Sequence, residues 1–384
     1  MTAGTALAIV AALVVAGAAA YLTGGDDPAP ETAAPTPTPQ GEDPVISTLF
    51  FGTKGDGRSA IWMTLVAYDT SENAGAVVYI PAHAAVEVPG RGLQGVGDAL
   101  GSGGVPLLVV SAENLLGMKI DNYVELSDQD ARTLFEATGP ISVDVPAEVR
   151  VAVGQDRARL IFAEGPQRLG PAFLAELLYV RGLESDDVEL GSRHLAFWDG
   201  LFDAFEDEPE NLAAAVRAAS GAMAQSSGEV AQQARLLGAL AGLDPANRTL
   251  TTLPVEQVSV GGSELYSVDQ EEVRALLSGI LSGVRPAGDE TKVQVLNGNG
   301  VPGIGQEIAE RLIGAGFRVV LTGNAPRLNY ERTLVVTYDD SPEAQAAAER
   351  ARDLIGVGTV QVSAQQQGIV DLTIVIGKDY LRTR

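Results

Sequence analysis

From Val45 onward, short runs of β-branched and aromatic residues alternate with segments of helical spacing, and no other feature constrains the fold as strongly. Strand-like runs include STLFFG (47–52), WMTLVAYD (62–69) and GAVVYIP (75–81), whereas LLVVSAENLLG (107–117) has the spacing of a helix. Strands that alternate with helices form sheets covered by helices. The sequence therefore predicts an α/β protein.

Composition divides the chain into four segments. Residues 1–22 are apolar and uncharged, residues 23–44 are rich in proline, threonine and acid, residues 45–285 form the larger α/β domain, and residues 290–381 form a small α/β unit. A polar Pro-Gly segment separates the last two. Residues 23–44 cannot bury a core, so we expect an extended linker.

The first segment is long enough to cross a membrane. About 20 apolar residues suffice for a transmembrane helix, so a single-pass anchor is the leading interpretation for residues 1–22. A cleaved signal peptide is the alternative, because Ala18 and Ala20 form an A-x-A pattern. Either interpretation predicts that the bulk of the chain is extracytoplasmic, at the cell membrane.

Charge and composition exclude several function classes. The chain holds 50 acidic and 26 basic residues, for a net charge of −24. Nucleic-acid affinity comes from basic residues that neutralise phosphates, so we expect no nucleic-acid partner. There is no cysteine, which excludes disulfides and thiolate metal sites. The only histidines are His83 and His194, too few for a histidine-rich zinc site unless both take part.

The small unit contains the spacing G-x-G-x-x-G at Gly298, Gly300 and Gly303, after the strand-like run VQVLN. A dinucleotide-binding loop has this spacing, but it also needs an acid about 20 residues later for the ribose, and no carboxylate occurs between Gly303 and Glu331 other than those of the intervening helix. We therefore expect a strand-to-helix turn, since Asn and Gly tolerate positive φ. A phosphate or glycan site at 297–300 is the alternative.

Several stretches carry a family resemblance. In the small unit they are VQVLNGNGVPGIGQEIAERLIGAGFRVV (293–320), NAP (324–326) and VDLTIVIGKDY (370–380). In the larger domain they are IPAHAAVEVPGRG (80–92), ENLLGMKIDNYVELS (113–127), GPISVDVP (139–146) and LLYVRG (177–182). The small unit resembles the LytR C-terminal domain, which commonly follows LytR-CpsA-Psr (LCP) domains in high-GC Gram-positive bacteria. The larger domain resembles the LCP domain.

The resemblance implies an α/β/α layered domain with a mixed sheet, followed by a small α/β C-terminal domain. LCP proteins hold a polyprenyl pyrophosphate-linked glycopolymer outside the membrane and transfer it to the cell wall, using Mg²⁺-binding aspartates and a clamp of arginines. Metal and guanidinium groups neutralise the charged leaving group. This chain departs from the pattern, because the Arg-Asp expected after Ile-Pro is Ala82-His83, and the acid expected near Arg58 falls on Ala60 or Ile61.

Arg58, Arg181 and Arg193 survive at clamp positions, so we expect them to bind polyprenyl phosphate, with structural salt bridges as the alternative. His83, Asp187 and His194 are expected at one pocket. We assign no catalytic or metal-binding residue and expect no cofactor, with Mg²⁺ only if the site is active. The aromatic residues are expected to line a lipid tunnel or the core: Trp62, Phe197, Trp198 and Phe202.

The sequence thus predicts a degenerate LCP-type protein of the cell envelope. It would bind polyprenyl phosphate or cell-wall glycopolymer, or support an active LCP paralogue as a protein partner, with membrane contact through the N-terminal helix. The alternative is an active phosphotransferase that attaches polyprenyl pyrophosphate-linked glycopolymer to the cell wall.

Overall fold

The computed structural model describes residues 44–88, 92–154, 157–183, 185–223, 225–260, 263–284, 290–363 and 369–383. All of these residues belong to one compact unit, Asp43–Arg384. The predicted anchor (1–22) and nearly all of the predicted linker (23–44) lie outside the described residues. The predicted division between the two domains, at residues 285–289, also lies outside the described residues and stays a prediction.

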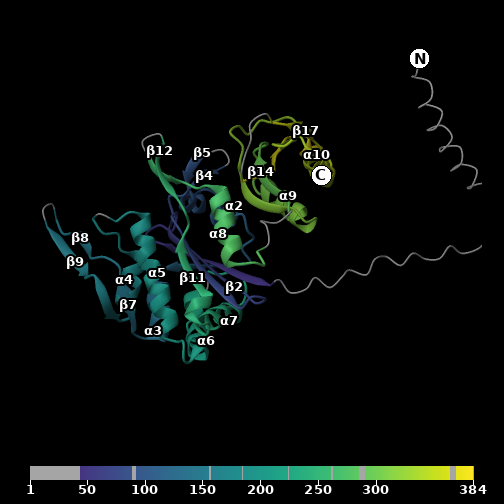
Figure 1. Cartoon of the computed structure of the whole chain (residues 1–384). Helices are drawn as coiled ribbons and strands as arrows, with labels where there is room; N and C mark the ends of the chain where they lie inside the picture. The colour runs from purple at the N-terminus through teal and green to yellow at the C-terminus, as the bar shows by residue number, and fades with distance from the viewer. Residues whose placement is uncertain are drawn as a thin grey trace, which may run out of the picture. The chain divides into compact units, whose positions relative to one another are not determined.

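The larger sheet has five strands in the order β11-β3-β2-β1-β6 (Figure 1). They are β1 (Val45–Thr53), β2 (Ala60–Asp69), β3 (Ala74–Ile80), β6 (Asn122–Ser127) and β11 (Arg248–Thr252). The pairs β1–β2 and β2–β3 are antiparallel, whereas β6 runs parallel to β1 and β11 parallel to β3. The sheet is therefore mixed, which confirms the prediction.

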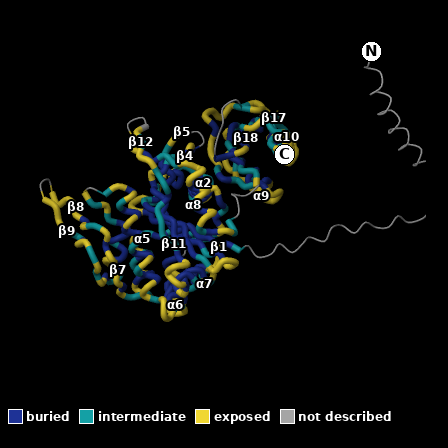
Figure 2. Tube along the Cα trace, viewed as in Figure 1, coloured by how far each residue is buried: buried dark blue, intermediate teal, exposed yellow. Residues whose placement is uncertain are grey.

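The strands of this sheet are apolar on both faces, as expected for strands buried between two layers of helices. Along β1, Phe50 packs into one core, whereas Leu49 and Phe51 pack into the core on the opposite face. The Phe50 side is covered by α3 (Asp128–Thr138), α4 (Pro171–Tyr179), α5 (Asp187–Asp203), α6 (Pro209–Ala218) and α7 (Val230–Ala241). The other side is covered by α2 (Ala99–Leu116) and α8 (Gln270–Ile280). Figure 2 shows buried strands between partly exposed helices, so the α/β/α layering is confirmed.

One described helical segment, Val96–Leu116, is long and apolar enough to cross a membrane. Most of it is buried inside the fold, where it packs against the larger sheet. It also bends at Gly104, where φ is +71° and glycine is favoured. The segment is a core helix of the α/β/α domain.

The smaller sheet also has five strands, in the order β15-β14-β18-β16-β17. Its elements are β14 (Lys292–Asn297), α9 (Ile304–Gly314), β15 (Arg318–Asn324), β16 (Leu334–Thr337), α10 (Pro342–Ile355), β17 (Thr359–Val362) and β18 (Leu372–Ile376). Only the pairing of β16 with β18 is antiparallel among the described pairs. These elements form the small α/β unit predicted from the sequence.

Strand β15, at one edge of the smaller sheet, packs against α2 of the larger domain. Val320 lies in the same apolar core as α2, together with Ile369 and Val370. Beside this contact, the Arg318 guanidinium donates to the Glu113 carboxylate at 2.6 Å. The Lys292 Nζ donates to the Asn114 side chain at 2.5 Å. An edge strand that would otherwise expose unpaired backbone groups is thus covered.

The spacing of apolar residues predicts a helix from about Ser192. Helix α5 begins earlier, at Asp187, because the Asp186 carboxylate accepts a hydrogen bond from the Glu189 N–H (2.8 Å) and caps the helix there. Helix α3 was not predicted from the sequence. The remaining strands pair in hairpins or two-stranded sheets: β4 (Ala85–Val88), β5 (Gly92–Gly95), β7 (Ile141–Val145), β8 (Val149–Ala152), β9 (Ala158–Phe162), β10 (Gly165–Leu169), β12 (Glu256–Val260) and β13 (Ser263–Ser267).

Candidate functional site

The Asp187 carboxylate holds two cationic side chains from distant parts of the chain. It lies at the first residue of α5 and is only 1% exposed. One oxygen accepts the backbone N–H of His83 at 2.8 Å and lies 2.8 Å from His83 Nδ1. The other accepts Arg181 Nη2 at 2.5 Å. We call Asp187, His83 and Arg181 the carboxylate cluster.

Electrostatics within the carboxylate cluster favour the charged forms. Burial acts to raise the pKa of Asp187, but the hydrogen bond and positive charge of His83 outweigh it and hold that pKa below its ordinary value. The same hydrogen bond raises the pKa of His83, against a smaller opposing effect of partial burial. Asp187 is therefore ionised at neutral pH, and His83 gains a proton more readily than a free histidine.

The two cations of the cluster also face solvent. The His83 side chain is 49% exposed and that of Arg181 is 36% exposed. Arg181 Nη2 donates weakly to the Ile61 carbonyl, at 3.4 Å, which places it beside the beginning of β2. The cluster is thus a buried anion with two partly exposed cations, an arrangement that can receive an anionic group.

Arg58 lies in the loop between β1 and β2 with its side chain exposed. No ion pair to Arg58 occurs within the part of the chain that the structure describes. The next residue, Ser59, donates to the Asp98 carboxylate at 3.0 Å, and Asp98 lies close enough to His83 to affect its pKa. The role of Arg58 in phosphate binding stays a prediction.

Arg193 differs from the other two arginines because it is fully buried. Its guanidinium donates to the carbonyls of Leu177 and Val180, both at 2.9 Å, and lies 2.9 Å from the Glu189 carboxylate. Those carbonyls belong to the C-terminal end of α4, where a cation is favourable. These contacts favour a structural role for Arg193, and phosphate binding by this residue stays a prediction.

His194 is buried among aromatic rings and is separate from the carboxylate cluster. Its ring lies 4.8 Å from the Trp62 ring and 5.1 Å from the Tyr79 ring, and its Nε2 lies 3.2 Å from the Leu178 carbonyl. Burial lowers the pKa of His194 to about 3, so the ring is neutral at physiological pH. Across the described ranges, no three histidine or acidic side chains are grouped to hold a metal ion.

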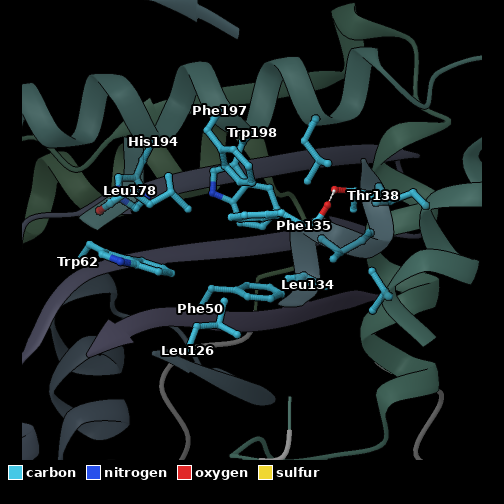
Figure 3. Close-up of a pocket in the computed structure, with 14 residues that line it drawn as sticks. Phe50, Trp62, Leu126, Leu134, Phe135, Thr138, Leu178, His194, Phe197 and Trp198 are labelled. Atoms are coloured by element: carbon cyan, nitrogen blue, oxygen red, sulfur yellow. Dashed lines mark hydrogen bonds between the residues drawn. The ribbon is translucent and has the colours of Figure 1, made fainter. Parts of the chain in front are cut away.

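An apolar pocket lies between the larger sheet and the helices on the Phe50 side (Figure 3). Its open space is about 20 Å³, room for about one water molecule. Both tryptophans of the chain line it, whereas Phe202 packs behind Trp198. The full lining is Phe50, Trp62, Leu126, Leu134, Phe135, Thr138, Leu178, His194, Phe197, Trp198, Leu201, Leu212, Val216 and Leu237.

Tyr79 connects this pocket to the carboxylate cluster, and sequence analysis did not single it out. Its ring contacts His194, and its buried hydroxyl has no hydrogen-bond partner in the described structure. Burial, and then the negative charge of Asp187, raise the pKa of Tyr79 well above its ordinary value. The ring occupies space left by Gly191, where a Cβ would lie 2.6 Å from it. No periodicity signals this pairing, because it joins a strand and a helix more than 100 residues apart.

The glycine-rich turn of the smaller sheet satisfies its own amides. The Asn297 side-chain oxygen accepts the N–H groups of Asn299 (3.2 Å) and Gly300 (2.9 Å), and the Asn299 oxygen accepts that of Val301 (2.9 Å). Gly300 and Gly303 have φ values of +83° and +79°. Amides already bonded within the turn are not free to cradle a phosphate, which favours the turn interpretation.

Comparison of folds defines the class of the larger domain. The chain is similar to TagV from B. subtilis, at 18% identity with a TM-score of 0.53, over 63% of this chain and 98% of that one. It is also similar to protein gbs0355 from Streptococcus agalactiae, at 16% identity with a TM-score of 0.50, over 62% of this chain and 87% of that one. A LytR-CPS2A-psr family protein, YwtF (TagT), solved with bound octaprenyl pyrophosphate lipid, is 19% identical over 63% of this chain and 92% of that one, with a TM-score of 0.45. The larger domain has the LCP fold.

The smaller sheet has a more specific assignment. Residues 290–380 match the family model LytR_C, described as "LytR cell envelope-related transcriptional attenuator". Residues 290–380 are therefore a LytR C-terminal domain, and the chain joins this domain to an LCP fold, as its sequence stretches indicated. No curated protein matches the chain.

Proposed function

We propose that this protein is an LCP-type component of the cell envelope that binds a polyprenyl phosphate and has little or no transferase activity. The tail would enter the apolar pocket, and the phosphate would meet the carboxylate cluster. The observation that carries the proposal is their proximity: Arg181 donates to the carbonyl of Ile61, the neighbour of the pocket-lining Trp62, and Asp187 lies on the same helix, α5, as the pocket-lining His194. The N-terminal segment 1–22 would hold the domain at the outer face of the membrane.

Two observations support the degenerate form of this proposal. Acids expected from the LCP resemblance are replaced by Ala60 or Ile61 and by Ala82-His83, none of which supplies a carboxylate. The retained acid, Asp187, has both oxygens occupied by His83 and Arg181. Mg²⁺ requires oxygen ligands with free coordination sites, so the residues present do not favour it.

The pocket is nearly closed, and lipid entry would require its lining side chains to move apart. Both tryptophans should report this movement, since Trp62 and Trp198 line the pocket and the chain has no others. Adding a short polyprenyl phosphate to the full chain in mild detergent is expected to give a saturable change in tryptophan fluorescence. The matching prenyl alcohol measures the contribution of the tail.

Leu201→Phe is expected to weaken this binding at least tenfold. The larger ring would enter a pocket with about 20 Å³ of open space, and overpacking opposes the entry of a tail. Leu328→Phe serves as the matched control, because Leu328 is 49% exposed and outside the pocket. Equal binding by both variants, with folding verified by circular dichroism, would contradict the proposed lipid site.

A second measurement separates a binding protein from an enzyme. Incubation of the chain with a polyprenyl pyrophosphate and Mg²⁺ is expected to release no phosphate product above background. Release that Arg181→Ala abolishes would overturn the degenerate form and support the phosphotransferase. Absence of both turnover and lipid binding would reject both and leave a scaffold role.

A further inference from the structure

The carboxylate cluster changes its net charge when one ring titrates. Asp187 contributes one negative charge and Arg181 one positive charge, so their sum is zero when His83 is neutral and becomes positive when His83 gains a proton. Asp187 is 1% exposed, whereas both cations reach solvent. The charge of the exposed surface of the cluster is therefore decided by His83.

Hydrogen bonding fixes which ring nitrogen of His83 titrates. Nδ1 lies 2.8 Å from Asp187 Oδ2, and an ionised carboxylate can only accept, so Nδ1 carries hydrogen in both protonation states. Nε2, on the other side of the ring, is the atom that gains or loses a proton. Protonation makes Nε2 a charged donor, whereas deprotonation leaves a lone pair that repels phosphate oxygens.

Neighbouring elements hold the backbone of His83 in place and supply the charged groups around its ring. The His83 carbonyl accepts the Tyr266 N–H of β13 at 3.0 Å, and the Ala82 carbonyl accepts the Gly97 N–H at 2.9 Å. The charged groups that face His83 are Asp187 from α5, Arg181 from the segment before it, and Asp98 at the start of α2. Asp187 and Asp98 favour the protonated ring and Arg181 opposes it.

We propose that His83 is a proton-dependent phosphate ligand, so that its protonated ring and Arg181, both held by Asp187, bind a phosphate monoester without a divalent metal. This inference rests on the proposed lipid-phosphate function and adds its regulation. The phosphate would accept Nε2–H of His83 and free N–H groups of Arg181, which has five donors. Binding strengthens as pH falls, because the protonated form exists below the pKa of His83.

The test compares the wild-type chain with His83→Gln, in mild detergent with EDTA, using a short polyprenyl phosphate from about pH 5.5 to pH 8. The ratio of the two affinities cancels the ionisation of the ligand itself. We expect the affinity of the wild-type chain divided by that of His83→Gln to rise about tenfold from the highest to the lowest pH. Arg132→Gln is the matched control, since it removes a partly exposed positive charge outside the cluster. The affinity of the wild-type chain divided by that of Arg132→Gln should not change with pH.

A second readout needs no variant. The chain has two histidines and His194 is buried, so the ring resonance of His83 can be followed by NMR. Saturating ligand is expected to raise the His83 titration midpoint by about one pH unit, which corresponds to tenfold tighter binding by the protonated form.

The outcomes separate the two proposals. Phosphate binding with a flat ratio and an unmoved midpoint, or binding that requires Mg²⁺, overturns the role of His83 and leaves the lipid-phosphate function standing. Equal binding of the polyprenyl phosphate and the prenyl alcohol at every pH also overturns the role of His83. No binding of either compound rejects the lipid-phosphate function and the role of His83 together.

Discussion

Replacing Arg193 with alanine is expected to lower the free energy of unfolding by about 3 kcal/mol, the scale for removing one partner of a buried ion pair. Arg193 is fully buried. Its removal leaves the Leu177 and Val180 carbonyls at the end of α4 without their donors, and the Glu189 carboxylate without its cation. Urea unfolding of the full chain, followed by circular dichroism, measures the loss.

Arg181→Ala is the matched control for that prediction. The Arg181 side chain is 36% exposed, and without it the buried Asp187 carboxylate still has the backbone N–H and the ring of His83 as partners, so we expect a loss below about 1 kcal/mol. For ligand binding we expect the opposite ranking of the two variants, with Arg181→Ala weakening phosphate binding more than Arg193→Ala does. A stable Arg193→Ala protein that no longer binds lipid phosphate would show that Arg193 is a clamp residue after all.

Arg318→Ala is expected to cost a similar amount, about 3 kcal/mol, at the contact between the two sheets. Glu113 is fully buried, and one of its oxygens depends on Arg318 at 2.6 Å. The other oxygen accepts the Ile120 N–H at 3.0 Å, which does not neutralise the charge. The variant therefore leaves a buried carboxylate without its paired cation. The midpoint of urea unfolding gives the measurement.

A second substitution tests the cause of this loss. Adding Glu113→Gln to Arg318→Ala is expected to recover part of the stability, because it removes the uncompensated charge and retains an acceptor for Ile120. Arg311→Ala, which breaks a partly exposed pair with Glu307 on α9, should cost well under 1 kcal/mol. A double variant less stable than Arg318→Ala alone would contradict the buried-charge explanation.

The contact at β15 also bears on how the two sheets behave as a unit. Val320 and Val370 share an apolar core with α2, and Arg318 pairs with a buried acid of that helix. If this packing couples the sheets, unfolding followed at Trp62 and Trp198 should coincide with loss of total secondary structure. The LytR C-terminal domain would then be an integral part of the described structure, held through α2.

Local sequence determined the order of the elements and the family label. Alternating apolar residues place Phe50 on one face of β1 and Leu49 on the other, and such alternation is visible along the chain. The Asn-Gly pattern at 297–300 predicted a turn for the same reason, since its hydrogen bonds join residues only two or three positions apart. The sequence also singled out Trp62, Phe197 and Trp198 as residues of a tunnel wall or of the core. In the structure they are buried core residues that also line the apolar pocket.

Only the tertiary structure decided what the candidate site residues contact. Arg181 and Arg193 have the same chemistry and lie 12 residues apart in the chain, yet one reaches solvent and the other is buried against α4. His83 and Asp187 are 104 residues apart, and their hydrogen bond exists only because β3 ends beside the beginning of α5. His194, two helical turns beyond Asp187, points into the pocket. Spacing along a chain sets which face of an element a side chain occupies, whereas its exposure, partner and pKa depend on what the fold packs against that face.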